Sequence, residues 1–198
     1  MKRSLHAMIF LVAPVLAVCA QPPLPQDHFY RLSVGAPDTP LAEPRFKGTL
    51  EVGRFVADGL TAGRPIVYGM ADRPYELHEY HYHFWTEPPP TMLRDQLVDY
   101  LRAAKVTTMV VTPEMRVEPD YVLAGRIKRL EKINGSPPRA VVELELALRR
   151  TANDELLFLG TYGVEAKAGA DTVAAAVAAF NDALTEIYAK FTADISGL

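Results

Sequence analysis

The chain has 198 residues, of which 49% are hydrophobic and 23% are charged, and its formal net charge is −3 at pH 7. This balance is typical of one globular domain of ordinary size and excludes a chain that is disordered throughout. Because the net charge is negative, no basic field attracts a polyanion, and nucleic acid is not an expected partner.

The first 19 residues have the features of an export signal. A cationic start, Lys2 and Arg3, precedes an apolar run over residues 7–17. Eleven residues are too few to cross a hydrocarbon core, which needs roughly 20 helical residues. A cationic start followed by a short apolar run predicts a signal peptide over residues 1–19.

The predicted signal peptide ends at the only cysteine of the chain, Cys19. A single cysteine excludes an internal disulfide and a zinc framework of Cys and His residues. The sequence Leu16-Ala17-Val18-Cys19 is similar to a bacterial lipobox, whose cysteine is diacylated and becomes the new N-terminus. We therefore predict lipid attachment at Cys19, which would anchor the domain to a membrane. Val18 stands where Gly, Ala or Ser is usual, and cleavage after Ala20 by ordinary signal peptidase is the alternative.

The mature chain begins with a proline-rich stretch. Residues 20–28 contain three prolines and are predicted to form a short, stiff tether. The folded domain is expected over residues 29–198. Its first three predicted strands cover residues 29–34, 49–56 and 65–70.

An aromatic-rich extended stretch follows over residues 75–85. A period of two residues places Glu79, His81 and His83 on one side of such a strand and Tyr80 on the other. Because imidazole and carboxylate groups bind zinc, His78, His81 and His83 with Glu79 form a candidate metal cluster, in which His81, His83 and Glu79 share one face. The alternative, which we favour, is a strand with half-exposed imidazole rings and no bound metal.

Three prolines at 88–90 are expected to end this stretch. Thr91 is the predicted N-cap of an amphipathic helix of about four turns that reaches Ala104. Its apolar residues fall at helical spacing: Leu93, Leu97, Tyr100, Leu101 and Ala104. A short strand is expected next, over residues 107–111.

The second half of the domain has the clearest pattern. Apolar and polar side chains alternate over residues 120–164, and turn sequences interrupt them at 134–138 and 153–154. This pattern predicts three consecutive antiparallel strands. One apolar stripe over residues 171–193 predicts a final helix. Two main helices and six to eight strands predict an α/β (α+β) fold, a two-layer sandwich with a mostly antiparallel sheet.

The sequence contains no recognisable catalytic arrangement. Ser33, Ser136 and Ser196 lie outside any Gly-x-Ser-x-Gly motif, and the chain has neither a glycine-rich phosphate loop nor a dinucleotide fingerprint. Glu143 and Glu145 fall on the polar face of a predicted strand, where carboxylates are usually solvated. We therefore predict that the protein is not an enzyme and has no catalytic residue and no cofactor.

Several short motifs occur in a fixed order along the mature chain. They are Tyr30-Arg31-Leu32, Ile66-Val67-Tyr68, the aromatic residues Tyr75, Tyr80 and Trp85, Glu87-Pro88-Pro89, Leu93 with Leu97 and Leu101, Asp120 with Leu123, Gly125 and Ile127, and Ala179-Phe180-Asn181-Asp182-Ala183-Leu184. Over about residues 29–190 this order resembles the ABC-type transport auxiliary lipoproteins. That family includes the lipoprotein component of the paraquat-inducible Pqi intermembrane transport system.

The resemblance implies a non-catalytic envelope lipoprotein that acts beside an ABC ATPase, a permease and an MCE-domain protein, which carries lipids between the inner and outer membranes. It carries over only Cys19, as the lipid attachment site. Ala20 at the next position implies sorting to the periplasmic face of the outer membrane. Since a meander offers a sheet edge, we expect docking onto the periplasmic part of the MCE-domain protein and a ring of copies.

Two other functions are compatible with the same sequence. One is a stand-alone periplasmic lipoprotein that binds a hydrophobic ligand between the sheet and the helices. The other is a regulator of cell-envelope assembly, which would require a peptidoglycan enzyme as its partner.

Overall fold

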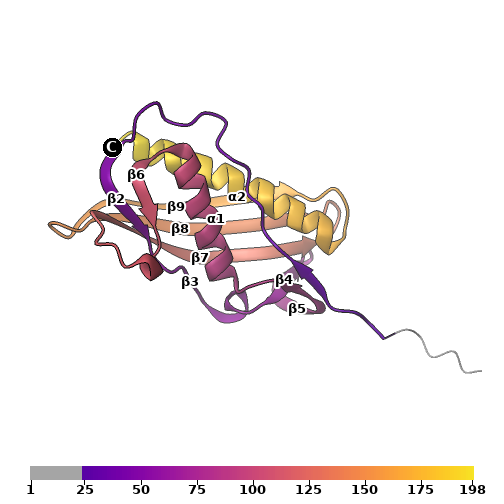
Figure 1. Ribbon diagram of the computed structural model, residues 1–198. Coiled ribbons are helices and arrows are strands. Elements are labelled where there is room, and N and C mark those ends of the chain that lie inside the picture. Colours follow the sequence, from indigo (N-terminus) through magenta and orange to yellow (C-terminus); the bar gives the residue numbers. More distant parts are fainter. Residues whose placement is uncertain (1–23) are drawn as a thin grey trace, which may run out of the picture.

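The computed structural model describes residues 24–198 of the protein. The predicted signal peptide over residues 1–19, with Cys19, and the first part of the predicted tether lie outside these residues. In the described chain, one sheet of nine strands curls like a half-barrel around two α-helices (Figure 1). The predicted α+β class with two main helices is confirmed.

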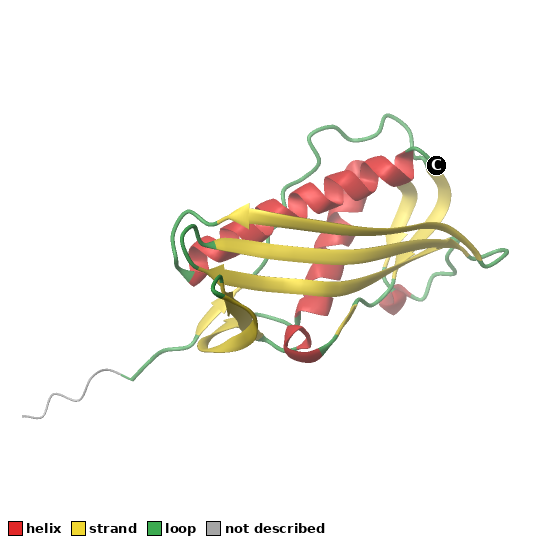
Figure 2. Ribbon diagram, turned by 180° about the vertical axis from the view of Figure 1, so that it is seen from behind, coloured by secondary structure: helices red, strands yellow, loops and turns green. Residues whose placement is uncertain are grey.

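The predicted meander is confirmed as three long antiparallel strands (Figure 2). They are β7 (Tyr121–Asn134), β8 (Arg139–Arg150) and β9 (Glu155–Lys167). The leucines of β8 are fully buried, whereas Glu143 and Glu145 alternate with them and are half-buried. Because each buried leucine contributes roughly 1.5–3 kcal/mol, this alternation determines which face of the strand meets the helices.

Three short strands pair with the edge of β7 that faces away from β8. They are β2 (Phe46–Val52), β3 (Val56–Ala57) and β4 (Pro65–Met70), and the 3-10 helix η1 (Gly59–Ala62) separates the last two. All three run parallel to β7 and pair with its beginning, its middle and its end in turn. The chain over residues 46–70 therefore lies beside β7 as one strand that is interrupted twice.

The remaining strands add further parallel pairs. β6 (Thr107–Val111), which the 3-10 helix η2 (Pro113–Met115) follows, pairs with β2, and β1 (His28–Tyr30) pairs with the end of β5 (Arg73–Trp85). Five of the eight strand pairings in residues 24–198 are parallel. The prediction of a mostly antiparallel sheet is therefore wrong. Alternation within one strand carries no information about the direction of its partner.

Both α-helices pack on the concave face of the sheet (Figures 1 and 2). They are α1 (Pro89–Ala104) and α2 (Val173–Ser196). The predicted apolar stripe of α2 is confirmed, because all its members are buried: Val173, Val177, Phe180, Leu184, Ile187, Tyr188 and Phe191. The hydroxyl of Tyr188 donates a 2.8 Å hydrogen bond to the carbonyl oxygen of Leu93 and joins the two helices. No helix in the described part of the chain is both long and apolar enough to span a membrane.

The two helices begin in different ways. α1 starts earlier than predicted: Pro88 is its N-cap and residues 89–90 form its first turn, so Thr91 lies within the helix and is not the cap. Proline suits a first turn because its fixed φ is helical and its missing N–H would have no partner there. In α2, the hydroxyl of Thr172 caps the helix and accepts a 3.2 Å hydrogen bond from the N–H of Ala175.

Candidate functional site

The chain enters the domain at β1, beside the end of β5. Tyr30 lies opposite Trp85, and its carbonyl oxygen accepts a 2.8 Å hydrogen bond from the N–H of Thr86. His28 is nine positions after Cys19 in the sequence, which is at most about 30 Å of extended chain. Cys19 lies outside the described residues, so lipid attachment there stays a prediction. If Cys19 carries a lipid, β1 is the first strand of the domain after the anchor.

The candidate metal ligands lie in β5, and a bulge rearranges them. Glu79 pairs with Val67 of β4, and Phe84 pairs with Pro65. The chain therefore advances five residues along β5 where β4 advances only two, so β5 has three extra residues there. Because the bulge reverses the alternation, the ring of His83 contacts the ring of Tyr80, with centroids 5.3 Å apart. The prediction that His81 and His83 share one face is therefore wrong. Within residues 24–198, no group of three or more His, Cys, Asp or Glu residues is placed to hold a metal ion.

Instead, the bulge builds a cluster of six rings from β1, β4 and β5, which we call the ring cluster: His28, Tyr30, Tyr68, His78, Tyr80 and His83. The imidazoles of His28 and His83 stack at 5.1 Å, and the rings of Tyr68 and Tyr80 lie 4.4 Å apart. Burial lowers the pKa of His83, and a charge on His28 would lower it further. The ring cluster thus ties the strand nearest the predicted anchor to the sheet.

A buried lysine connects the ring cluster with α2. The side chain of Lys132 in β7 is 1% exposed, and its ammonium group donates hydrogen bonds to side-chain oxygens of Asn134 and Asp171. The same oxygen of Asn134 accepts a 3.4 Å hydrogen bond from the hydroxyl of Tyr80. A buried charge needs such partners, because its desolvation is costly. Sequence reasoning missed this pair, although Lys132 interrupts a buried stretch of β7.

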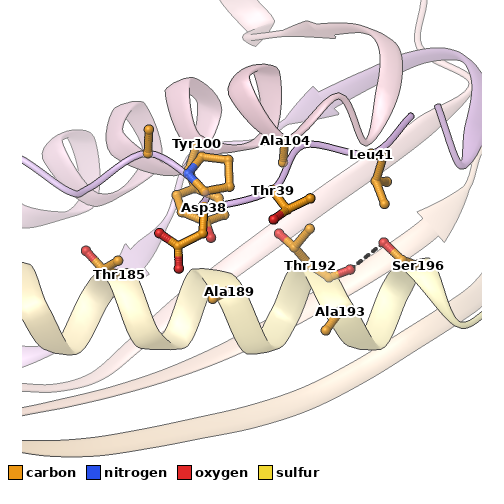
Figure 3. A pocket seen from close by; sticks show the side chains of 12 residues that line it. Asp38, Thr39, Leu41, Tyr100, Ala104, Thr185, Ala189, Thr192, Ala193 and Ser196 are labelled. Carbon is orange, nitrogen blue, oxygen red and sulfur yellow. Dashed lines mark hydrogen bonds between the residues drawn. The ribbon is translucent and has the colours of Figure 1, made fainter. Parts of the chain in front are cut away.

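A second feature is a cavity on the solvent side of the two helices (Figure 3). Residues 34–45, which we call the strap, cross over α1 and α2 there. The strap is held at both ends, because the N–H of Gly35 donates to the hydroxyl of Thr185 at 3.1 Å and the N–H of Leu41 donates to the carbonyl oxygen of Ala104 at 3.0 Å. Between these contacts the strap covers a space of about 370 Å³.

The cavity wall combines small apolar side chains with hydroxyl groups. Ala189 and neighbouring residues of α2 form one wall, and Tyr100 of α1 forms another (Figure 3). Burial raises the pKa of Tyr100, and the carboxylate of Asp38 in the strap raises it further. The hydroxyl of Thr192 is buried without a hydrogen-bond partner among the described residues. Such a wall suits a small ligand that has both an apolar part and a hydrogen-bonding group.

The space between the sheet and the helices, where the ligand-binding alternative placed its ligand, is occupied by side chains of the core. Leu97 of α1 and Leu184 and Ile187 of α2 are fully buried there, against Leu144 of β8. The cavity described above therefore lies outside the core and not within it.

Two long strand edges have no partner strand in the described chain. β9 pairs only with β8, so its outer edge is free from Glu155 to Lys167. β1 covers only the last three residues of β5, so the edge of β5 is free over residues 73–82. A free edge presents backbone N–H and C=O groups to which another chain can bind.

Comparison with known proteins agrees with the fold. The profile of the ABC-type transport auxiliary lipoprotein component family matches residues 30–191. The structure is similar to that of protein XCC0632 from Xanthomonas campestris, with a TM-score of 0.73 and 26% sequence identity over 86% of this chain and 96% of that one. No curated protein matches the sequence.

Two further solved structures share the fold. An uncharacterized protein has a TM-score of 0.65 at 18% identity, over 86% of this chain and 97% of that one. The hypothetical protein CT253 from Chlamydia trachomatis has a TM-score of 0.50 at 8% identity, over 77% and 97%. The family match spans most of the sequence and confirms the resemblance that the order of motifs indicated. The chain therefore belongs to the ABC-type transport auxiliary lipoprotein component family.

Proposed function

We propose that this protein is the lipid-anchored docking component of a transport system that also contains an ABC ATPase, a permease and an MCE-domain protein. It binds the periplasmic part of the MCE-domain protein and holds it to the membrane that receives or supplies the lipid. The observation that carries the proposal is the family match over residues 30–191, because the family is an auxiliary lipoprotein component of ABC-type transport.

The anchor in this proposal is a diacylated Cys19. Ala20, which follows it, favours the periplasmic face of the outer membrane. The mass of the N-terminal peptide of the mature protein tests this part. A diacylglyceryl group on Cys19 is expected, whereas a chain that begins at Gln21 would replace the anchor with ordinary signal-peptide cleavage.

The free edge of β9 supports a docking role. The edge is 13 residues long, and Leu156 and Leu159 are exposed on this strand. An extended segment of a partner can add to such an edge through main-chain hydrogen bonds, with exposed leucines supplying apolar contact. In a ring of copies, the same edge would meet the next subunit.

The proposed role is non-catalytic. The carboxylate of Glu143, one of the paired glutamates of β8, lies 3.2 Å from the ammonium group of Lys128. A carboxylate that forms an ion pair on the outer face of a sheet is an ordinary surface feature. Catalysis is therefore assigned to the ATPase of the system and not to this chain.

Crosslinking in intact cells tests the docking. The tagged full-length protein is crosslinked mildly, purified from detergent-solubilised membranes and identified with its partners by mass spectrometry. We expect an MCE-domain protein with its permease and ATPase. Leu159→Lys should reduce this recovery, whereas Met109→Lys, at a position of β6 that is also about half exposed, should not. Recovery of the protein alone contradicts docking, and recovery with peptidoglycan enzymes favours a regulator of envelope assembly.

The cavity beneath the strap supports a second candidate function, a stand-alone lipoprotein that binds a small ligand. The variant Ala189→Phe would fill this space of about 370 Å³. Native mass spectrometry should then show a small molecule bound to the wild type and absent from the variant. An unliganded wild type, together with recovery of the transport partners, removes this candidate.

A further inference from the structure

The exposed aromatic side chains of the described chain gather on two neighbouring strands. Among the exposed large hydrophobic residues within 24–198, three are aromatic: Phe29 of β1 and Tyr75 and Tyr82 of β5. Leu77 of β5 is exposed as well. We call these four residues the apolar rim. Tyrosine is favoured where water meets an apolar phase, because its ring is apolar and its hydroxyl is polar.

The apolar rim lies at the end of the molecule from which the tether leaves. Figures 1 and 2 both show the β4–β5 hairpin beside β1, at the point where the chain runs out toward the N-terminus. β1 is a direct neighbour of β5 in the sheet, because His28 pairs with His83 in a parallel ladder. With at most about 30 Å of chain between Cys19 and β1, an anchored domain keeps this end close to the bilayer.

The charges around the apolar rim are compatible with a lipid surface. The guanidinium group of Arg64 lies 5.5 Å from the centre of the Phe29 ring. A cation held against an apolar side chain in this way can meet a lipid phosphate while the ring enters the interface. On the β4–β5 hairpin, Arg73 forms ion pairs with Asp72 at 4.0 Å and with Glu76 at 3.3 Å, whereas the exposed Glu79 forms no ion pair with any described residue.

The free edge of β5 limits how deep the apolar rim can go. Along the outer edge of β5, which faces away from β4, the backbone N–H and C=O groups of residues 73–82 have no partner strand in the described chain, and hydrocarbon cannot satisfy them. The headgroup layer can, because it contains water and phosphate oxygens. The apolar rim is therefore suited to the headgroup layer and not to the hydrocarbon core.

We propose that the apolar rim rests in the headgroup layer of the membrane that holds the lipid anchor. β1 and β5 then face the bilayer, and the edge of β9 stays available to protein partners. This inference depends on the proposed anchor at Cys19. It adds an orientation: the protein lies against its membrane by a defined face instead of swinging freely on its tether.

Lipid quenching of an introduced tryptophan tests this orientation. Tyr75→Trp places the probe on the apolar rim, and Leu159→Trp places a matched probe on β9; both positions are exposed, so neither change disturbs the core. Trp85 is buried and contributes the same background to both variants. Each lipidated mature protein is reconstituted into vesicles of phosphatidylethanolamine and phosphatidylglycerol whose acyl chains are brominated near the headgroup.

Interfacial side chains lie about 5–10 Å into the membrane boundary, so we expect the fluorescence added by Tyr75→Trp to fall by about half. The fluorescence added by Leu159→Trp should fall by less than about a tenth, because β9 is turned away from the lipid. Equal quenching of the two probes overturns the inference. A Tyr75→Trp probe that the brominated lipid does not quench, but whose emission changes when an MCE-domain protein is added, also overturns it, since the apolar rim would then be a protein contact.

The mass of the N-terminal peptide separates the two levels of the proposal. If Cys19 carries a diacylglyceryl group and the probes are quenched equally, the orientation is wrong and the anchor stands. If Cys19 is unmodified, the anchor is wrong, and the orientation that depends on it fails with it.

Discussion

The hydroxyl of Tyr30 and the Nδ1 atom of His83 are hydrogen-bonded at 2.9 Å. This bond joins β1, the strand nearest the predicted anchor, to β5, the longer strand of the β4–β5 hairpin. β1 has only three residues, so few backbone bonds hold it. One side-chain hydrogen bond contributes about 0.5–1.5 kcal/mol, which is a large share of what keeps so short a strand in place.

Removing the hydroxyl should loosen β1. Tyr30→Phe keeps the ring and deletes the hydrogen bond, so we expect the free energy of unfolding to fall by about 0.5–1.5 kcal/mol. Hydrogen exchange of the β1 amides should become faster. Tyr75→Phe is the matched control, because that side chain is 99% exposed and its loss of a hydroxyl should change neither quantity. Equal effects of the two variants would show that the bond does not hold β1.

Stability should fall at mildly acidic pH because of His83. Burial first, and His28 second, lower the pKa of His83 from the usual 6.5. A lowered pKa means that the folded state favours the neutral imidazole of His83. The stability that this preference contributes is fully present above pH 6.5 and is lost as the pH falls through the folded-state pKa of His83. Urea unfolding of the wild type should show this loss, and His83→Gln should show a smaller one. Parallel pH profiles for the two proteins would contradict the assignment.

The pair of Lys132 and Asp171 gives an asymmetric prediction. Asp171→Ala leaves a buried ammonium group with one partner fewer, so we expect a loss of about 1–3 kcal/mol. The double variant with Lys132→Met should recover part of this loss, since it also removes the charge. Glu186→Ala, which breaks an exposed ion pair with Lys190, should cost less than about 1 kcal/mol. Chemical denaturation of all three variants gives these differences, and a double variant less stable than Asp171→Ala would contradict them.

The ring of Phe55 leaves no room for a side chain at Gly125. A Cβ atom at Gly125 would lie 2.4 Å from that ring, and Phe55 is itself buried, so neither group can move freely. We expect Gly125→Ala to destabilise the fold by about 1–3 kcal/mol, which thermal unfolding would show. Gly163→Ala is the matched control in β9, because its nearest neighbour would be 3.9 Å away. A tolerated Gly125→Ala would mean that Phe55 has room to shift.

Local pattern was sufficient for the meander, for α2 and for the family. The leucines of β8 repeat with the period of a strand, and the apolar stripe of α2 repeats with the period of a helix. Both sets of residues are buried in the core. The start of α1 was missed because Thr91 suggested a polar cap, whereas Pro88 and the two prolines after it form the cap and the first turn. The predicted strand over residues 49–56 is split into β2 and β3, since each pairs separately with β7.

The sequence by itself determined the composition of the core, the antiparallel meander and the membership of a lipoprotein family, because periodicity and motif order are local properties of the chain. Only the tertiary structure decided the parallel side of the sheet, the bulge that moves His83 away from His81, and the pairing of Lys132 with Asp171. It also placed the exposed aromatic residues beside the tether. Each of these depends on which distant segments pair, and the free energy of such contacts is set across the fold and not within any one element.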